Sequence, residues 1–179
     1  LKIVANYAVG FDNIDRETSK KRNIMFTNTP GVLKNTVAEH TFALMLSIAH
    51  RIAESDKFTR KGQYKAWGPE LLLGTNIFGK TLGIVGLGRI GSRVAYHAVK
   101  GFDMKIMYTD LKANPDFEKE FGAIYVSNID DLLPQCDFVA ILLGSDEDAR
   151  RHPRGTAEDE SRCDQAARFG AFAPSTELR

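Results

Sequence analysis

The hydrophobic pattern divides the first 143 residues into short apolar runs that alternate with amphipathic segments. Apolar or β-branched runs predict strands at 1–5, 24–27, 82–85, 104–109, 123–126 and 137–143, the last of them continuous enough for a fully buried parallel strand. Amphipathic segments between these runs predict helices. Strands alternating with helices at this spacing predict the α/β class, a Rossmann-like parallel sheet with flanking helices. We expect this fold to be incomplete at both ends.

Start and stop signals place several of the predicted helices. Thr36 followed by Glu39 has the spacing of a capping box and predicts the start of a long helix. Between residues 42 and 52 that helix is apolar most of the way round, which predicts burial between domains or between subunits. Ser127 followed by Asp130 predicts the cap of a short helix, and residues 57–79 are predicted to form a mixed loop.

Other signals concern the remaining short helices. The polar helix that precedes residue 24 should end at Asn23, which tolerates a left-handed conformation. A helix opened by Asn114 and Pro115 should stop at Gly122, with cap and stop residues in favoured places.

The motif Gly86-x-Gly88-x-x-Gly91 directly follows one predicted strand and opens a helix whose Ile90, Val94 and Ala98 share one face. Strand, glycine turn and helix in this order indicate a dinucleotide-binding site. Gly86 allows the sharp turn, Gly88 lets the backbone approach a pyrophosphate, and Gly91 lets the helix pack close to its strand. A plain structural glycine turn is the alternative interpretation.

An acidic residue stands where such a site needs one. Asp110 ends the next predicted strand, about twenty residues beyond the glycine motif. A carboxylate at this position accepts hydrogen bonds from the hydroxyls of an adenine ribose and repels a 2′-phosphate. This position favours NAD over NADP. A solvated aspartate at a strand end is the alternative.

Composition excludes several classes of function. The formal net charge of +1 gives no reason to expect a nucleic acid or a membrane as partner, and no apolar run approaches the length of about 18 residues that spans a bilayer. Cys136 and Cys163 have no metal-binding or redox spacing and favour a reduced, cytoplasmic protein without a metal site. His40 and His50 have no acid at a pairing distance, and we interpret both as packed or solvated. Trp67 is either a packing anchor or a partner contact.

The character of the chain changes at residue 144. Residues 144–179 are rich in Ala, Arg, Asp, Glu, Ser and Gly and contain no Lys, Val, Ile or Met. Such a segment buries too little apolar area to offset the entropy of ordering it. Because the change follows a buried strand, we hypothesise that 144–179 is an out-of-frame or otherwise foreign tail, with a natural disordered tail as the alternative. The chain also begins at Leu1 without a methionine, so we expect its true start to be missing.

Several motifs together resemble a known family. The segments Ala-Val-Gly-Phe-Asp-Asn-Ile-Asp (8–15), Thr-Asn-Thr-Pro-Gly-Val-Leu (27–33), Thr-Val-Ala-Glu (36–39) and the glycine motif with its strand (79–91) resemble the D-isomer-specific 2-hydroxyacid dehydrogenases, nearest to the glyoxylate/hydroxypyruvate reductase branch. The resemblance runs from residue 1 to about 143. It implies a remnant of a substrate domain at 1–33, a partial NAD-binding Rossmann domain at 34–143, and a homodimer through the helix that starts near Thr36.

The resemblance also implies roles for single residues. The amides of Val9 and Gly10 would hold the carboxylate of a small 2-keto or 2-hydroxy acid, and Thr36 would lie near the nicotinamide. The turn Gly88-Arg89-Ile90 would bind the pyrophosphate of NAD. Asp110 would bind the adenosine ribose, and Trp67 resembles an aromatic residue that some members reach across the dimer.

The family's catalytic Arg, Glu and His have no counterparts in this chain. The Asn-x-x-Arg-Gly segment and the later His motif are absent, and we interpret His152 and Arg154 as coincidences. An acid–base pair fixes the proton that accompanies hydride transfer. We therefore expect a truncated NAD-dependent oxidoreductase, whose intact relatives reduce glyoxylate or hydroxypyruvate, with turnover near zero by this chain. The alternatives are a non-catalytic NAD-binding module resembling NAD-sensing corepressors, and an unstable fragment.

Overall fold

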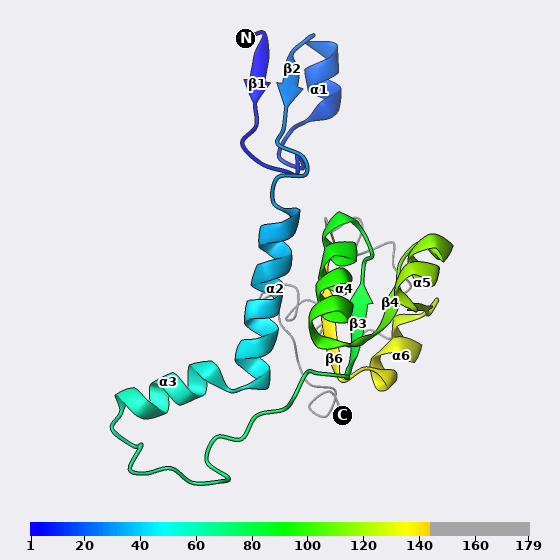
Figure 1. The fold of residues 1–179 in the computed structure, drawn as a ribbon. Helices are drawn as coiled ribbons and strands as arrows, with labels where there is room; N and C mark the ends of the chain where they lie inside the picture. Colours follow the sequence, from blue (N-terminus) through cyan, green and yellow to red (C-terminus); the bar gives the residue numbers. More distant parts are fainter. Residues whose placement is uncertain (144–179) are drawn as a thin grey trace.

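A computed structural model describes residues 1–143, and the hypothesis about the tail lies outside the described residues. The N-terminal part consists of β1 (Ile3–Ala5), α1 (Arg16–Lys21), β2 (Met25–Thr27), α2 (Lys34–Ala49) and α3 (Ile52–Arg60). The remainder consists of β3 (Thr81–Val85), α4 (Arg89–Phe102), β4 (Lys105–Thr109), α5 (Pro115–Phe121), β5 (Ile124–Tyr125), α6 (Ile129–Leu132), a 3₁₀ turn (Leu133–Gln135) and β6 (Phe138–Ile141). All six predicted strands are present. Figure 1 labels β1 to β4 and β6.

The larger sheet has four parallel strands in the order β5-β4-β3-β6, which confirms the predicted α/β class with a Rossmann-like parallel sheet. From β3 the chain moves outward to β4 and β5 and then returns to the other side of β3 as β6. The strand order therefore reverses between β3 and β6. In open parallel sheets, ligands bind beyond the carboxyl ends of the strands at such a switch point.

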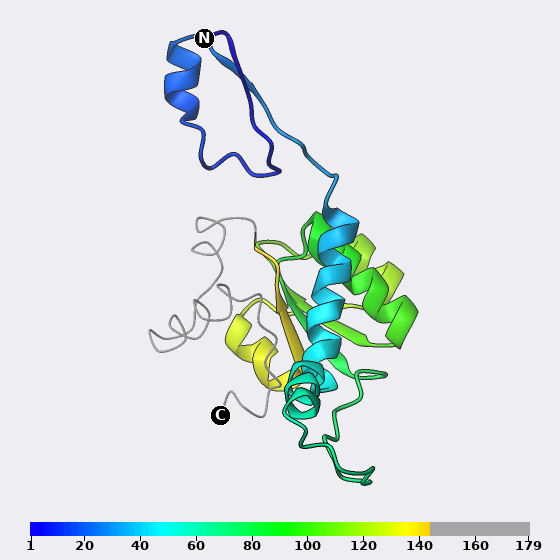
Figure 2. The same cartoon turned by 90° about the vertical axis from the view of Figure 1, so that its left-hand side faces the viewer.

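Both faces of this sheet are covered by helices. One face packs against α2 and α4 in a cluster that includes Phe42, Met45, Ile84, Val94 and Tyr108. The other face packs against α6 and the 3₁₀ turn through a smaller cluster. Figure 2 shows the sheet between the yellow α6 on one side and the cyan α2 and green α4 on the other. This double cover explains why the strands are almost continuously apolar.

The first strand–helix–strand segment forms a separate two-stranded parallel sheet at the N-terminal end of α2 (Figure 1). Asp15 caps α1 by accepting a hydrogen bond of 3.0 Å from the Thr18 amide. The helix ends at Lys21 with Arg22 as its C-cap, and Asn23 has the expected left-handed conformation with φ of 53°. None of the α1 residues is buried.

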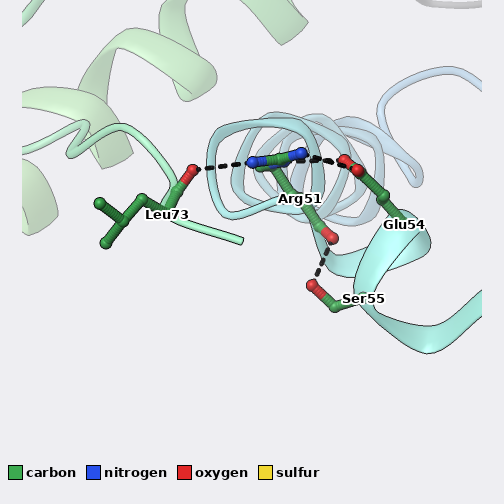
Figure 3. A network of polar contacts seen from close by, with 4 residues as sticks. All are labelled: Arg51, Glu54, Ser55 and Leu73. Carbon is green, nitrogen blue, oxygen red and sulfur yellow. Dashed lines mark hydrogen bonds and ion pairs between the residues drawn. The ribbon is translucent and has the colours of Figure 1, made fainter. Parts of the chain in front are cut away.

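A bend between α2 and α3 directs α3 and the following segment away from the sheet (Figure 1). Arg51, in a left-handed conformation with φ of 53°, donates hydrogen bonds of 2.7 and 2.6 Å to Glu54 and one of 3.4 Å to the Leu73 carbonyl (Figure 3). The Thr75 amide donates to the Ala49 carbonyl at 2.7 Å. These bonds attach both ends of the projecting arm, residues 52–74, to the end of α2.

Three local predictions were wrong. Helix α2 begins at Lys34 after a turn in which Gly31 has φ of 82°, so Thr36 lies inside its first turn, and no side chain of residues 1–143 caps the helix. The short helix α6 is capped by Asn128 instead of Ser127, because the Asn128 side chain accepts from the Asp130 amide at 3.1 Å. Residues 57–60, predicted as loop, belong to α3.

Within residues 1–143, α2 buries one stripe and leaves Ile48 40% exposed. The burial of its other apolar side chains between domains or between subunits stays a prediction. The short helix after Asn114 agrees with its prediction: the Asn114 side chain accepts from the Phe117 amide, and Gly122 ends the helix with φ of 63°.

Candidate dinucleotide-binding site

The glycine motif forms the connection from β3 to α4 at the carboxyl end of the sheet. Gly86 has φ of 94°, a conformation that side chains rarely adopt. A Cβ atom added at Gly91 would lie 2.2 Å from the Gly86 carbonyl oxygen, so only glycine allows α4 to pack this close to the turn. Gly88 is exposed, and a Cβ there would meet nothing within 4 Å. The conformation of Gly86 and the close packing at Gly91 fit a tight glycine turn, whereas the approach of a pyrophosphate at Gly88 stays a prediction.

The N-terminus of α4 is open to a ligand. Gly88 is its N-cap, and no side chain among the described residues caps the helix. Arg89 is exposed and Ile90 half-buried. Since the first amide groups of a helix lack partners inside it and carry the positive end of its dipole, this terminus can bind phosphate oxygens.

Asp110 follows β4 next to this turn. Its carboxylate accepts hydrogen bonds from the Leu87 amide at 2.7 Å and from the Leu111 amide at 2.6 Å. The first bond connects Asp110 to the glycine turn itself. A depression of about 420 Å³ lies beside them and is lined by Leu87 and residues 110–115. The structure therefore places Asp110 beside the glycine turn, at the edge of an open depression.

The structure adds residues that sequence reasoning missed. Tyr108, fully buried in β4, donates a hydrogen bond of 2.7 Å to Glu118 and accepts one of 2.6 Å from the Asn114 amide. Burial raises the pKa of Tyr108 to about 12, so its hydroxyl keeps its proton at neutral pH. The available signal was a tyrosine within a predicted strand, because a phenol hydroxyl needs a partner wherever it is buried.

The other predicted residues lie apart from the glycine turn. Val9 and Gly10 are in the N-terminal unit, where Asn28 and Asn6 donate hydrogen bonds of 2.9 Å to their carbonyls. Thr36 is exposed in the first turn of α2. Within residues 1–143 no hydrogen bond joins Val9, Gly10 or Thr36 to the turn. Their assignment to substrate and nicotinamide stays a prediction.

The only free cysteine among the described residues is a structural one. Cys136 is buried, and burial raises the pKa of its thiol to about 12, with Asp137 adding to the effect. A neutral buried thiol is a poor nucleophile. Residues 1–143 also hold no group of three or more His, Cys, Asp or Glu residues suited to a metal ion, and within them no helix is long and apolar enough to cross a membrane.

Comparison with known proteins agrees with this geometry. The family model described as "D-isomer specific 2-hydroxyacid dehydrogenase, NAD binding domain" matches residues 42–152, which include the glycine turn and Asp110. The chain belongs to this family. The resemblance inferred from the motifs is confirmed, and so is NAD as the cofactor, since this domain is the NAD-binding domain of the family.

Relatives with solved or curated descriptions extend the comparison. A glyoxylate reductase of Korarchaeum cryptofilum is 51% identical over 142 residues, covering 79% of this chain and 42% of the relative. One of Thermococcus onnurineus is 48% identical over 147 residues, covering 80% and 43%. D-Lactate dehydrogenase of Aquifex aeolicus, solved with NAD and lactic acid, superposes with a TM-score of 0.69 at 34% identity, covering 82% of this chain and 43% of that one. The chain spans less than half the length of these relatives.

The residues present fit NAD. The Cβ-free approach at Gly88 and the uncapped α4 terminus suit a pyrophosphate, and the Asp110 carboxylate at the edge of the depression suits a ribose diol.

Proposed function

We propose that the chain supplies the NAD-binding part of an oxidoreductase that acts on the CH–OH group of small D-2-hydroxy acids, reducing glyoxylate or hydroxypyruvate. The carrying observation is the contact between the Asp110 carboxylate and the Leu87 amide, which joins a ribose-binding acid to the glycine turn. Relatives that are glyoxylate reductases support the substrate class.

The geometry of the site supports the following roles. NAD supplies the hydride chemistry when it is bound. The α4 amides after Gly88 hold the pyrophosphate, with Arg89 and Ile90 at the start of that helix, and Asp110 holds the adenosine ribose. A 2′-phosphate would lie against the Asp110 carboxylate, so like-charge repulsion favours NAD over NADP.

The substrate half rests on the resemblance. We assign the amides of Val9 and Gly10 to the substrate carboxylate and Thr36 to the nicotinamide end, with residues 1–33 as the remnant of a substrate domain and 34–143 as the partial NAD-binding domain. The family's acid–base pair and substrate-orienting Arg have no counterparts in residues 1–179. We therefore expect this chain by itself to bind the cofactor with no measurable turnover.

A homodimer through α2 and a cytoplasmic location complete the proposal. Exposed apolar side chains on α2 and the projecting arm support the dimer, with Ile48, Ile52 and Trp67 exposed by 40, 53 and 79%. Nothing in residues 1–143 specifically favours the alternative of a non-catalytic corepressor-like module.

Titration of the chain with NADH and NADPH tests the proposal. We expect NADH to bind at least about tenfold more tightly than NADPH, the selectivity of one unfavourable charge contact. Asp110→Asn should weaken NADH binding and reduce this preference, whereas Asp116→Asn on α5, outside the depression, should change neither. Absence of NADH binding by the folded chain would contradict the proposal. Reduction of glyoxylate by a preparation free of host dehydrogenases would contradict the expectation that this chain alone has no turnover.

A further inference from the structure

The segment that lines the adenosine side of the site is irregular and exposed, yet it is fixed at both ends. Residues 111–114 belong to no strand or helix, and Pro115 begins α5. All five residues are exposed. Together with Leu87 and Asp110 they line the depression. An exposed loop of this kind holds one conformation only where buried groups bind its backbone.

Two buried or half-buried tyrosines provide those groups. The Tyr108 hydroxyl accepts from the Asn114 amide at 2.6 Å and donates to Glu118 at 2.7 Å. The Tyr125 hydroxyl, on the neighbouring strand β5, donates to the Asp110 carbonyl at 3.2 Å. The two rings contact each other, with centroids 5.4 Å apart. The loop is thus bound at its first and at its penultimate lining residue from beneath.

We propose that Tyr108 and Glu118 are positioning residues for the adenosine half of NAD. Glu118 orients the Tyr108 hydroxyl, so that an oxygen lone pair faces the Asn114 amide. The Asn114 amide then holds the loop wall, and through the loop it fixes the Asp110 carboxylate against the Leu87 amide. This inference rests on the proposed function, because it assigns a support to the same NAD site.

The partners explain why a hydroxyl is needed at position 108. The backbone N–H of Asn114 can only donate a hydrogen bond, and the Glu118 carboxylate can only accept one. The group between them must therefore accept from the first and donate to the second. A phenol does both. Phenylalanine fills the same buried volume and does neither, which leaves the Asn114 amide without its partner.

Binding of ADP-ribose to the 179-residue chain tests the inference. Tyr108→Phe should weaken ADP-ribose and NADH by the same factor, about three- to tenfold for a lost hydrogen bond, because the loop touches only the adenosine half. Tyr96→Phe on α4 is the matched control, since no hydrogen bond within residues 1–143 uses its hydroxyl, and it should leave both affinities unchanged. Unchanged affinity in Tyr108→Phe would overturn the inference.

A second pair of variants covers the case in which Tyr108→Phe does not fold. Glu118→Gln keeps an acceptor and should bind ADP-ribose as the unaltered chain does, whereas Glu118→Ala should lose affinity as Tyr108→Phe does. Equal affinities in this pair would contradict the inference.

Amide exchange in the ligand-free chain separates the two proposals. Tyr108→Phe should accelerate exchange at Asn114 and spare the α4 amides, whether or not NADH binds. If the unaltered chain binds neither NADH nor ADP-ribose while Asn114 exchange responds, the proposed function fails and the loop support stands. If NADH and ADP-ribose bind but Tyr108→Phe leaves amide exchange at Asn114 unchanged, only the loop support is contradicted.

Discussion

Two parallel strand–helix–strand units of the described residues, β1-α1-β2 and β3-α4-β4, share a topology and differ in burial. In the N-terminal unit, β1 and β2 have three residues each, only the middle one is half-buried, and α1 buries nothing. In the second unit, β3 and β4 have five residues each, of which four are buried, and α4 buries Val94, Ala95 and Ala98. Parallel pairing alone therefore does not create a core.

The difference comes from what surrounds each pair of strands. β3 has β4 on one side and β6 on the other, and helices cover both faces. β1 pairs with β2 alone. An isolated two-stranded sheet is marginal in water. We infer that the four-stranded sheet sets the cooperative unfolding of the chain and that the N-terminal unit opens locally at lower free energy.

Shortening a central side chain in each unit gives the largest expected contrast. Ile84→Ala removes a fully buried side chain from β3 and should lower the free energy of unfolding by about 2–5 kcal/mol, because a cavity remains between sheet and helices. Val4→Ala in β1, half-buried, should cost less than about 1 kcal/mol. Urea denaturation followed by circular dichroism measures both. Equal shifts in the midpoint would show that the two units unfold as one.

A pair of glycine substitutions sharpens the comparison at the sites themselves. Gly91→Ala places a Cβ 2.2 Å from the Gly86 carbonyl, which should force α4 away from the turn, cost about 1–3 kcal/mol and weaken NADH binding at least tenfold. A Cβ atom added at Gly10 would lie 3.3 Å from its nearest neighbour, a carboxylate oxygen of the Asp12 side chain.

Gly10→Ala is the matched control, because the exposed Asp12 side chain can move aside and Gly10 has no positive φ. We expect no measurable change in its urea midpoint or in its NADH affinity. Should Gly91→Ala bind NADH as well as Gly10→Ala does, the close approach of α4 to the turn would not matter for the cofactor.

The elements of the second unit could be predicted because each signal is local. The spacing of Ile90, Val94 and Ala98 predicts one helix face, and the structure buries Val94 and Ala98 and half-buries Ile90. Residues 104–109 predict β4, and the glycine motif predicts the turn before α4. In each case the sequence within a few residues determines the conformation.

What could not be predicted depends on contacts between distant residues. The place of β6 beside β3 follows from pairing such as Ile84 with Ala140, which no local pattern contains. The proposed support of the site depends on the hydrogen bond that Tyr108 in β4 donates to Glu118, ten residues further on in α5. The start of α2 at Lys34 was missed because Leu33 already has right-handed helical dihedral angles as the N-cap, which places Thr36 within the first turn.

We expect pH to affect the four-stranded sheet and the N-terminal unit differently, the first at alkaline pH and the second at acid pH. In the four-stranded sheet and the elements that cover it, burial raises the pKa values of Tyr108 and Cys136 from 10.0 and 9.0 to about 12. The unfolded chain therefore releases these protons at lower pH than the folded chain. Their contribution to stability is fully present below pH 9 and is lost as pH rises toward 12. The urea midpoint should fall over this range, and Cys136→Ala should make the fall shallower.

The N-terminal unit should respond at acid pH and by a smaller amount. Hydrogen bonds from the Thr18 hydroxyl and amide lower the pKa of Asp15 below its usual 3.8, so its contribution is present above that pH and is lost as pH falls through the lowered value. Because α1 buries nothing, we expect faster amide exchange at Thr18 without an Asp15-dependent shift of the urea midpoint. Asp15→Asn should remove the acid dependence at Thr18. At acid pH the urea midpoints of Asp15→Asn and the unaltered chain should be equal, because a cap confined to a locally opening helix cannot change global stability. A difference between the two midpoints would mean that the N-terminal unit unfolds with the sheet.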